Sequence, residues 1–447
     1  MDLIAGDIVE GRVLDFGSDG EGIIKLEGYP VFVPYAIKGE DIRARIVYVK
    51  KDCAFGEIVE IVNASPSRIK PRCPYYGKCG GCGLQHVDKD MQLEIKRETV
   101  RRALLKNAGI VFDVPSPVRL NDWEYRNKMS LPFYRNPRSG NISLGFYEKR
   151  SHKVIPIKWC PLHGEWAGKA IAAVTEWANA HKLGVYDEST GRGLLRHAVF
   201  RYLDSLSATI VINGVRLPEI DDLVKRLKSV FGSFTLYVSA NTKRNNVIMG
   251  DSAELVYGEE KPQNLGVFKA VVSPKSFLQV NDDIRDAIYD RVAEELGGFD
   301  GDIVELYSGI GLLGAQLSMR LPRANIVGVE IERAASENAV ALMRTLGLSD
   351  RVKCVCDDAK HFCENMPFSD KRRALVLDPP RRGCDREVLM SAKGFEKIIY
   401  ISCNPQTLAR DIKILSKDYD LTCVQPYEMF PQTAEIETVA VLSCSDR

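Results

Sequence analysis

The segment Ile303-Val304-Glu305-Leu306-Tyr307-Ser308-Gly309-Ile310-Gly311-Leu312-Leu313-Gly314 predicts a buried strand, a glycine-rich turn and the start of a helix. Gly309, Gly311 and Gly314 form a GxGxxG pattern. Glycines at these positions let the backbone pass close to a ligand at a helix N-terminus. The pattern is typical of both dinucleotide and S-adenosylmethionine pockets. Taken alone it is a weak indication, because a tight strand-to-helix turn needs glycine anyway.

Strands and helices alternate around this segment. An amphipathic helix is expected over 284–296, followed by strands at Asp302–Tyr307, Ile326–Glu330, Val352–Cys356, Ala374–Leu377, Lys397–Ile401, Leu421–Pro426 and Thr438–Ser443. The alternation predicts a doubly wound α/β sheet with a predominantly parallel core. Glu330 ends the second strand, where a carboxylate can accept hydrogen bonds from ribose hydroxyls. These features indicate a nucleoside cofactor and leave NAD and S-adenosylmethionine open.

The fourth strand ends in Asp378-Pro379-Pro380-Arg381. Both prolines fix φ, and Pro379 favours an extended conformation at Asp378. The Asp378 carboxylate is therefore expected at the carboxyl end of the sheet, where such folds bind ligands. A purely structural turn is the alternative.

The fifth strand ends in Ser402-Cys403-Asn404-Pro405, close to where Asp378 is expected. A helix beginning near Pro405 would lower the thiol pKa, so Cys403 is a candidate nucleophile rather than a buried structural cysteine. Glu435 and Glu437 precede the last strand. Either carboxylate could act as a general base, and if the segment is extended both point the same way.

The first part of the chain predicts a different architecture. Five short strands rich in Val and Ile lie within residues 1–63, which fits a small barrel of the oligonucleotide-binding (OB) type, used either for RNA binding or as a spacer. Residues 64–265 predict a mixed α+β central domain, and residues 266–447 form the α/β domain. A helix is expected from a cap at Asp88 to about Ala108, with Gly109 as its stop.

Charge is distributed unevenly along the chain. The 447 residues contain 61 Lys and Arg against 60 Asp and Glu, a net charge of +1. Between Ser65 and Lys106, however, ten cations face four anions, which gives +6. This segment is the candidate phosphate-contacting face, and a solvated helix surface is the alternative.

Three of the twelve cysteines, Cys73, Cys79 and Cys82, follow a C-x5-C-x2-C spacing. A metal site built on them needs a fourth ligand, and a group of buried thiols without metal is the alternative. No stretch approaches 18 uninterrupted apolar residues and no secretory signal is visible at the N-terminus. We therefore expect no membrane span, a cytoplasmic location and reduced thiols.

The motifs together resemble those of the RNA uridine-5-methyltransferases that act on ribosomal and transfer RNA. The Asp378-Pro379-Pro380-Arg381 and Ser402-Cys403-Asn404-Pro405 turns, the Phe430-Pro431-x-Thr433 segment before Glu437 and the run from Ser273 to Asn281 occur in the family's order and spacing. The N-terminal barrel resembles the TRAM module through Glu21-Gly22-Ile23 and Val31-Phe32-Val33-Pro34. The resemblance covers essentially the whole chain.

The resemblance implies a Rossmann-like methyltransferase domain that uses S-adenosylmethionine. It implies that Cys403 adds to carbon 6 of a uracil and that Glu437 later removes the proton from carbon 5. By family position, the cofactor and target-base pocket is lined by Gln279, Tyr307, Glu330 and Asp378, beside Gly309 and Gly311 of the turn. Arg126 is expected to hold a flipped base. Glu435 stands where the family commonly has His, and Leu312 where many relatives have Asn.

The resemblance also supplies Cys160 as the fourth ligand and implies a 4Fe–4S cluster, with zinc on the same cysteines as the physical alternative. We expect a monomer that acts on RNA, with 23S ribosomal RNA favoured over transfer RNA by family habit. Two other hypotheses stay open: a non-catalytic iron–sulfur RNA-binding protein, and an amino-group methyltransferase that would not require Cys403.

Overall fold

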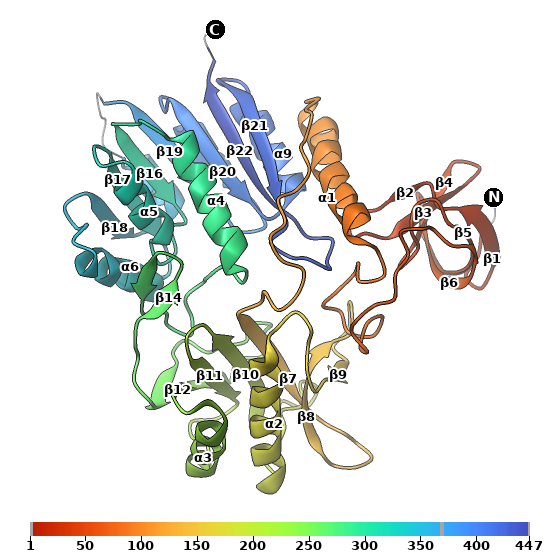
Figure 1. Ribbon diagram of the computed structural model, residues 1–447. Helices are drawn as coiled ribbons and strands as arrows, with labels where there is room; N and C mark the ends of the chain where they lie inside the picture. Colours follow the sequence, from red (N-terminus) through yellow and green to blue (C-terminus); the bar gives the residue numbers. More distant parts are fainter. Residues whose placement is uncertain (1–2, 367–370, 446–447) are drawn as a thin grey trace.

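The computed structural model describes residues 3–366 and 371–445 and contains three large sheets that follow one another along the chain (Figure 1). Each sheet has its own hydrophobic core. Over the described ranges, no helix has the length and apolar character that crossing a membrane requires. The boundaries expected at residues 63 and 265 stay predictions.

The N-terminal sheet has the strand order β1-β5-β6-β4-β3-β2. Its strands are β1 (Ile8–Arg12), β2 (Asp15–Phe16), β3 (Gly22–Leu26), β4 (Tyr29–Val33), β5 (Asp41–Val49) and β6 (Ala54–Asn63). Neighbouring strands are antiparallel except β4 and β6. Alternate residues such as Ile24, Val31 and Ile42 point into one small core, as period-2 patterning requires. The five expected strands are present, with β2 in addition, and closure into an OB-type barrel stays a prediction.

The central sheet has the order β13-β12-β11-β10-β7-β8-β9. Its strands are β7 (Lys128–Arg135), β8 (Ile142–Tyr147), β9 (Val154–Pro156), β10 (Leu195–Tyr202), β11 (Leu206–Ile212), β12 (Phe234–Ala240) and β13 (Glu254–Tyr257). Helices α2 (Glu165–Ala180) and α3 (Ile220–Phe231) pack against it through the fully buried Trp177 and their apolar stripes. This confirms the mixed α+β prediction.

The C-terminal sheet has the order β18-β17-β16-β19-β20-β22-β21. Its strands are β16 (Asp302–Leu306), β17 (Asn325–Glu330), β18 (Val352–Cys356), β19 (Arg373–Leu377), β20 (Lys397–Ser402), β21 (Tyr419–Tyr427) and β22 (Glu437–Cys444). The first five are parallel, and β22 lies antiparallel between β20 and β21. All seven predicted strands are confirmed, and the doubly wound α/β prediction with them.

Helices line both faces of this sheet. They are α4 (Asp282–Glu295), α5 (Leu312–Arg320), α6 (Arg333–Thr345), α7 (Ala359–Glu364), α8 (Arg386–Ser391) and α9 (Pro405–Leu415). A short hairpin of β14 (Gln263–Leu265) and β15 (Phe268–Ala270) leads into α4 and packs in the same core. The two cores, one on each face of the sheet, include Ile303 and Val376 on one side and Val304 and Leu377 on the other.

Helix α1 (Lys89–Ala103) connects the N-terminal part to this sheet (Figure 1). Its predicted cap is confirmed, because the Asp88 carboxylate accepts a hydrogen bond from the Met91 amide at 2.8 Å. One π-helical turn, η1 (Leu104–Ala108), follows α1, and Gly109 ends it with φ 74°. Val100 and Leu104 pack into the core beneath α9, so α1 is anchored on the C-terminal sheet.

A buried ion pair anchors the same helix. Lys96 and Glu428 are both fully buried, with Nζ 2.7 Å from Oε1, and Arg119 approaches the other carboxylate oxygen at 3.1 Å. Burial lowers the pKa of Lys96, and Glu428 opposes this shift. Removing one member of such a pair leaves uncompensated charge in the core.

We therefore predict that Lys96→Met destabilises the protein by about 3 kcal/mol. Lys89→Met, at an exposed position of the same helix, should change the free energy of unfolding by less than about 0.5 kcal/mol. Urea denaturation followed by tryptophan fluorescence measures both values. Equal midpoints for the two variants would contradict a structural role for the Lys96–Glu428 pair.

Candidate active site

Four of the predicted site residues lie at one edge of the C-terminal sheet. Tyr307, Asp378 and Cys403 directly follow β16, β19 and β20, and Glu330 is the last residue of β17. These strands are parallel, so their carboxyl ends meet at the same edge. The structure thus brings together residues up to 96 positions apart in the sequence, Tyr307 to Cys403.

The glycine-rich turn forms a tight backbone cradle at this edge. The backbone has positive φ at three positions of the turn: 66° at Tyr307, 58° at Gly309 and 79° at Gly311. Residues other than glycine rarely adopt this conformation. The Glu330 carboxylate accepts hydrogen bonds from the amides of Gly309 (2.9 Å) and Glu332 (2.7 Å). The space beside Gly309 is open, since a Cβ there would meet no atom within 4 Å. A cradle of this kind fits a nucleoside with its ribose beside Glu330.

Glu305 was not identified from the sequence. It lies in the middle of β16, is 4% exposed, and its Oε2 has no hydrogen-bond partner. The sequence feature that could have identified Glu305 is an acidic residue within an apolar run. Burial, together with the charge of Asp378, raises the pKa of Glu305 to about 8. Gly314 is required here, because a Cβ at that position would lie 2.9 Å from this oxygen.

The raised pKa of Glu305 predicts a pH-dependent stability. Between about pH 4.5 and pH 8 the unfolded chain loses this proton and the folded chain keeps it, so stability falls as pH rises. The stabilising effect of the protonated Glu305 carboxyl is present in full below about pH 4.5. Above that, the free energy of unfolding falls by about 1.4 kcal/mol per pH unit up to about pH 8. We predict that Glu305→Gln gains stability relative to wild type between pH 5 and pH 8. Thermal unfolding at a series of pH values measures this difference, and a constant difference would contradict it.

Gln279 lies in the loop that leads into α4. Asn127 holds this loop, because its side-chain amide donates to the Gln279 carbonyl at 3.1 Å and its backbone amide donates to Val280 at 3.0 Å. Asn281 caps α4, and its backbone pairs with Arg126 in an isolated bridge. These contacts therefore hold the loop that carries Gln279 against the segment that carries Arg126.

Cys403 and Glu437 lie opposite one another because of strand register. Ser402 at the end of β20 pairs with Thr438 in β22, which runs the other way. The next residue after Ser402 and the one before Thr438 are Cys403 and Glu437. Glu437 is 2% exposed, and its charge acts on the Cys403 thiol.

The expected lowering of the thiol pKa is wrong. Burial, reinforced by the charges of Glu437 and Asp378, raises the pKa of Cys403 to about 12, and Arg381 opposes this only in part. The helix α9 does begin at Pro405, but its cap is Asn404, whose side chain accepts from the Gln406 amide at 3.0 Å. Cys403 therefore precedes the cap, and burial together with nearby negative charge outweighs the helix dipole.

The two carboxylates before the last strand differ in environment. Glu435 forms an ion pair with Arg381, and both side chains are largely exposed. Glu437 is enclosed, and burial together with Asp378 raises its pKa well above the usual value. The two side chains therefore lie in different environments, whereas an extended segment would have pointed both the same way. Only Glu437 is buried beside Cys403.

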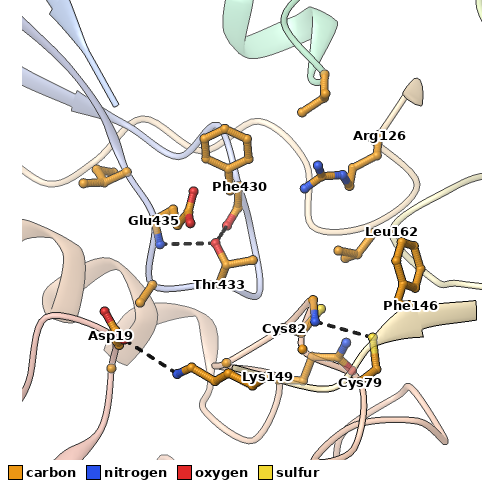
Figure 2. A pocket seen from close by; sticks show the side chains of 18 of the residues that line it. Asp19, Cys79, Cys82, Arg126, Phe146, Lys149, Leu162, Phe430, Thr433 and Glu435 are labelled. Carbon is orange, nitrogen blue, oxygen red and sulfur yellow. Dashed lines mark hydrogen bonds and ion pairs between the residues drawn. The ribbon is translucent and has the colours of Figure 1, made fainter. Parts of the chain in front are cut away.

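A cavity of about 860 Å³ opens in front of Cys403. All three parts of the chain line it, with Tyr35 from the turn after β4, Phe146 from the central sheet and Phe430 from the loop before β22. Figure 2 shows the Arg126 side chain pointing toward Phe430, and the Arg126 guanidinium lies 5.8 Å from the Phe430 ring centroid. An aromatic ring and a cation placed in this way suit a planar base.

The same cavity reaches the predicted cysteine cluster. Cys73, Cys79, Cys82 and Cys160 all line it, and Figure 2 shows Cys79 and Cys82 side by side. Burial raises the pKa of all four thiols, reinforced among Cys82, Cys160 and Cys79 by neighbouring cysteines. Among the described residues, no three His, Cys, Asp or Glu side chains are arranged to ligate a metal. The cysteines fit a thiolate-bound metal in number and type.

The segment from Ser65 to Lys106 carries less free positive charge than its composition suggested. Half of its ten cations form ion pairs: Arg68 with Glu40, Lys96 with Glu428, Arg97 with Glu94, Arg101 with Glu98 and Arg102 with Asp15. Lys96 is completely buried and contacts no solvent. Outside these pairs the segment carries Lys70, Arg72, Lys78, Lys89 and Lys106, and its role as a phosphate-contacting face stays a prediction.

Comparison with known proteins identifies the family. A family model described as tRNA (uracil-5-)-methyltransferase matches residues 194–445. An uncharacterized RNA methyltransferase of Halalkalibacterium halodurans is 35% identical, over 98% of this chain and 97% of that protein. One from Listeria monocytogenes is 33% identical over 97% of each chain.

A solved structure is similar over nearly the full length. The tRNA (uracil-54, C5)-methyltransferase of Pyrococcus abyssi, in complex with S-adenosyl-L-homocysteine, superposes with a TM-score of 0.77 at 26% identity. The match covers 97% of this chain and 99% of that one, so it includes the N-terminal and central sheets. The chain therefore belongs to the tRNA (uracil-5-)-methyltransferase family and is an RNA (uracil-5-)-methyltransferase.

Proposed function

We propose that the chain methylates carbon 5 of a specific uridine in RNA, with Cys403 as nucleophile, Glu437 as general base and S-adenosylmethionine as methyl donor. The observation that carries this proposal is the register of β20 and β22, which sets the buried Glu437 opposite Cys403, and Cys403 lines the cavity. A half-buried thiol beside an enclosed carboxyl is the pair of groups that addition and elimination at uracil require.

The chemistry begins with Cys403. Carbon 5 of uracil is a poor nucleophile until its conjugation with the carbonyl is broken. Addition of the Cys403 sulfur to carbon 6 breaks the double bond and places the electron pair on the enolate that includes carbon 5. S-adenosylmethionine, when bound, supplies the methyl group that carbon 5 takes. Because the thiol pKa is raised in the free protein, Cys403 must give its proton to solvent before it adds. The pKa of Glu437 is raised too, so this group must also reach the elimination step as the carboxylate.

Glu437 then completes the reaction. Its carboxylate takes the proton from carbon 5, the electrons of that C–H bond re-form the double bond to carbon 6, and the bond to sulfur breaks. Cys403 leaves as a thiolate and the methylated uridine is released. Glu435 also lines the cavity, but it is less suited to this step, since its carboxylate is paired with Arg381 and lies partly in solvent.

Other residues have supporting roles in this proposal. Arg126 and Phe430 hold the flipped uracil against the cavity wall, supported by the Arg126 side chain that points toward Phe430 (Figure 2). The cofactor is held by Gln279, Tyr307, Gly309, Gly311, Glu330 and Asp378, supported by the cradle at the sheet edge and the adenosine-type ligand of the Pyrococcus relative. The N-terminal sheet contributes an RNA-binding wall, because Pro34 and Tyr35 line the same cavity as Cys403.

The RNA class has two candidates. We propose 23S ribosomal RNA, on the family habit of combining a barrel with a cysteine cluster. Transfer RNA is the second candidate, favoured by the nearly full-length similarity to an enzyme that acts on tRNA uracil 54.

Mass-spectrometric mapping of 5-methyluridine in ribosomal and transfer RNA from a deletion strain tests the proposal. Loss of one 5-methyluridine, restored by the wild-type gene and not by a Cys403→Ala copy, would support it and name the RNA. An unchanged 5-methyluridine pattern would favour the non-catalytic RNA-binding hypothesis. A missing N-methylated base instead would indicate an amino-group methyltransferase.

We also propose that Cys73, Cys79, Cys82 and Cys160 hold a 4Fe–4S cluster with a structural or RNA-positioning role. Four thiols that line the same cavity support this. They would bind as thiolates, so metal binding would release the protons that burial holds on them. Zinc on the same four residues remains the physical alternative.

Metal analysis of anaerobically purified protein tests the cluster. We predict about four iron and four sulfide per chain, with iron lost in Cys79→Ser. Cys444→Ser, at an exposed cysteine near the C-terminus, should keep the wild-type iron content. Stoichiometric zinc without iron or sulfide would contradict the cluster and leave the four-cysteine site in place.

A further inference from the structure

The loop between β21 and β22 depends on the N-terminal half of the chain for its shape. This loop, Glu428–Ile436, leads directly to Glu437. Its Phe430 carbonyl accepts from Lys96 Nζ at 3.0 Å, and its Pro431 carbonyl accepts from the Tyr125 hydroxyl at 3.0 Å. The approach to the proposed base is thus held by residues more than 300 positions earlier in the sequence.

Gln432 is the centre of these contacts. It is 4% exposed and has φ 72°, a left-handed conformation that a residue with a side chain adopts only when its surroundings hold it there. The Gln432 carbonyl accepts from the amides of Gly83 (3.2 Å) and Leu84 (3.0 Å). These two residues directly follow Cys82 of the cysteine-rich loop.

Gln92 of α1 holds Gln432 from the other side. The Gln92 side-chain oxygen accepts from the Gln432 amide at 3.2 Å, and its nitrogen lies 3.1 Å from the Gln432 side-chain oxygen. The same nitrogen also lies 3.0 Å from the Leu84 carbonyl and 2.8 Å from the Val87 carbonyl. Gln92 is 1% exposed, so these partners have no water to replace them.

We propose that Gln432, fixed in its left-handed conformation by Gln92 and by the amides after Cys82, is a positioning residue for Glu437. This inference rests on the proposed role of Glu437 as base. Cys403 is held by other contacts, since Asn404 caps α9 and donates to the Arg381 carbonyl at 3.0 Å. Releasing Gln432 should therefore slow removal of the carbon-5 proton and spare the addition of Cys403 and the methyl transfer.

The consequence is specific to one step. With the base displaced, the methylated uracil stays bonded to Cys403 at carbon 6, because the bond to sulfur breaks only as the carbon-5 proton leaves. A displacement of about 1 Å can slow such a step on the order of 100-fold. A covalent protein–RNA species should then accumulate, which a general loss of stability would not produce.

The test compares two substitutions of Gln432 in single-turnover assays with methyl-labelled cofactor and RNA. Val strongly disfavours positive φ, whereas Gly adopts it freely and keeps both bonds to the backbone carbonyl. We expect Gln432→Val to accumulate at least about tenfold more of the covalent species than wild type. Its total label transfer should stay within about twofold of wild type. Gln432→Gly should release product like wild type. Lys182→Val is the matched control, because Lys182 has φ 49° on an exposed turn after α2.

Equal behaviour of the Val and Gly variants would overturn the inference, as would slower label transfer without covalent species. If Gln432→Val does not fold, Gln92→Met decides in its place, with the same covalent accumulation expected. Glu437→Gln in the same assay separates failure of the positioning role from failure of the proposed base. If it accumulates covalent species and the Gln432 and Gln92 variants do not, only the positioning role fails. If Glu437→Gln itself accumulates none, the proposed base fails.

Discussion

Cys403→Ala is expected to abolish transfer of methyl groups to RNA, lowering the rate by at least about 10⁴-fold. Without the sulfur, no electron pair is delivered to carbon 5 in the proposed mechanism. Cys384, another cysteine near this edge, is buried. Burial, reinforced by the charge of Asp411, raises its pKa to about 12, and the contacts with Tyr400 and Tyr307 oppose this only in part. The measurement is single-turnover transfer of labelled methyl groups to RNA.

The control for this prediction is cofactor binding. The cradle of Tyr307, Gly309 and Glu330 does not depend on the thiol, so Cys403→Ala should bind S-adenosyl-L-homocysteine within about twofold of wild type by calorimetry. Cys423→Ala, at a cysteine on β21, should keep its activity. Full methylation by Cys403→Ala would refute the nucleophile and favour amino-group methylation. Loss of both binding and activity would mean that the substitution disturbs the site as a whole.

The positions of the site residues along the sheet could be predicted because parallel strands impose them. Once β16, β17, β19 and β20 are recognised as apolar runs, each polar residue that ends a run must lie at the same edge. Glu330, Asp378 and Cys403 were found in this way. Glu305 was missed because it lies inside its run, where an acidic residue carries no periodic signal.

The electrostatics of the site could not be predicted from local sequence. A helix start after Cys403 suggested an acidic thiol, and the helix is present. The main cause of the raised thiol pKa is burial, reinforced by the charges of Glu437 and Asp378, which come from other strands and depend on register. The free charge of the basic segment could not be predicted from its composition for the same reason, since Arg102 pairs with Asp15, 87 residues away.

The conformation of Gln432 is a third case. The sequence Phe430-Pro431-Gln432-Thr433 contains no glycine, so nothing local predicts a left-handed residue there. The conformation depends on the amides of Gly83 and Leu84, about 350 residues earlier. Local patterns thus predicted the strands and their ends, whereas contacts between distant segments determine how the site residues are oriented and charged.

Glu437→Gln is expected to trap the enzyme on its RNA. The amide can occupy the same buried space beside Cys403 but cannot take the carbon-5 proton, so addition and methyl transfer proceed and elimination does not. Multiple turnover should fall by about 10² to 10⁴-fold, the usual contribution of a general base. The covalent species should be visible as protein bound to labelled RNA after denaturing electrophoresis, and it should be absent from the double variant with Cys403→Ala.

Glu435→Gln is the matched comparison, because it makes the same chemical change two residues away. Its partner is Arg381, and both side chains are exposed, so its loss removes a surface ion pair worth less than about 1 kcal/mol. We expect near-normal turnover and no covalent species. If Glu435→Gln accumulates the species and Glu437→Gln does not, the base is Glu435, and the segment must then move to bring it to the uracil. Because Glu437 begins a buried strand and pairs with Tyr427, whereas Glu435 is free to reorient if the Arg381 pair opens, the two variants test whether a fixed or a mobile carboxylate removes the proton.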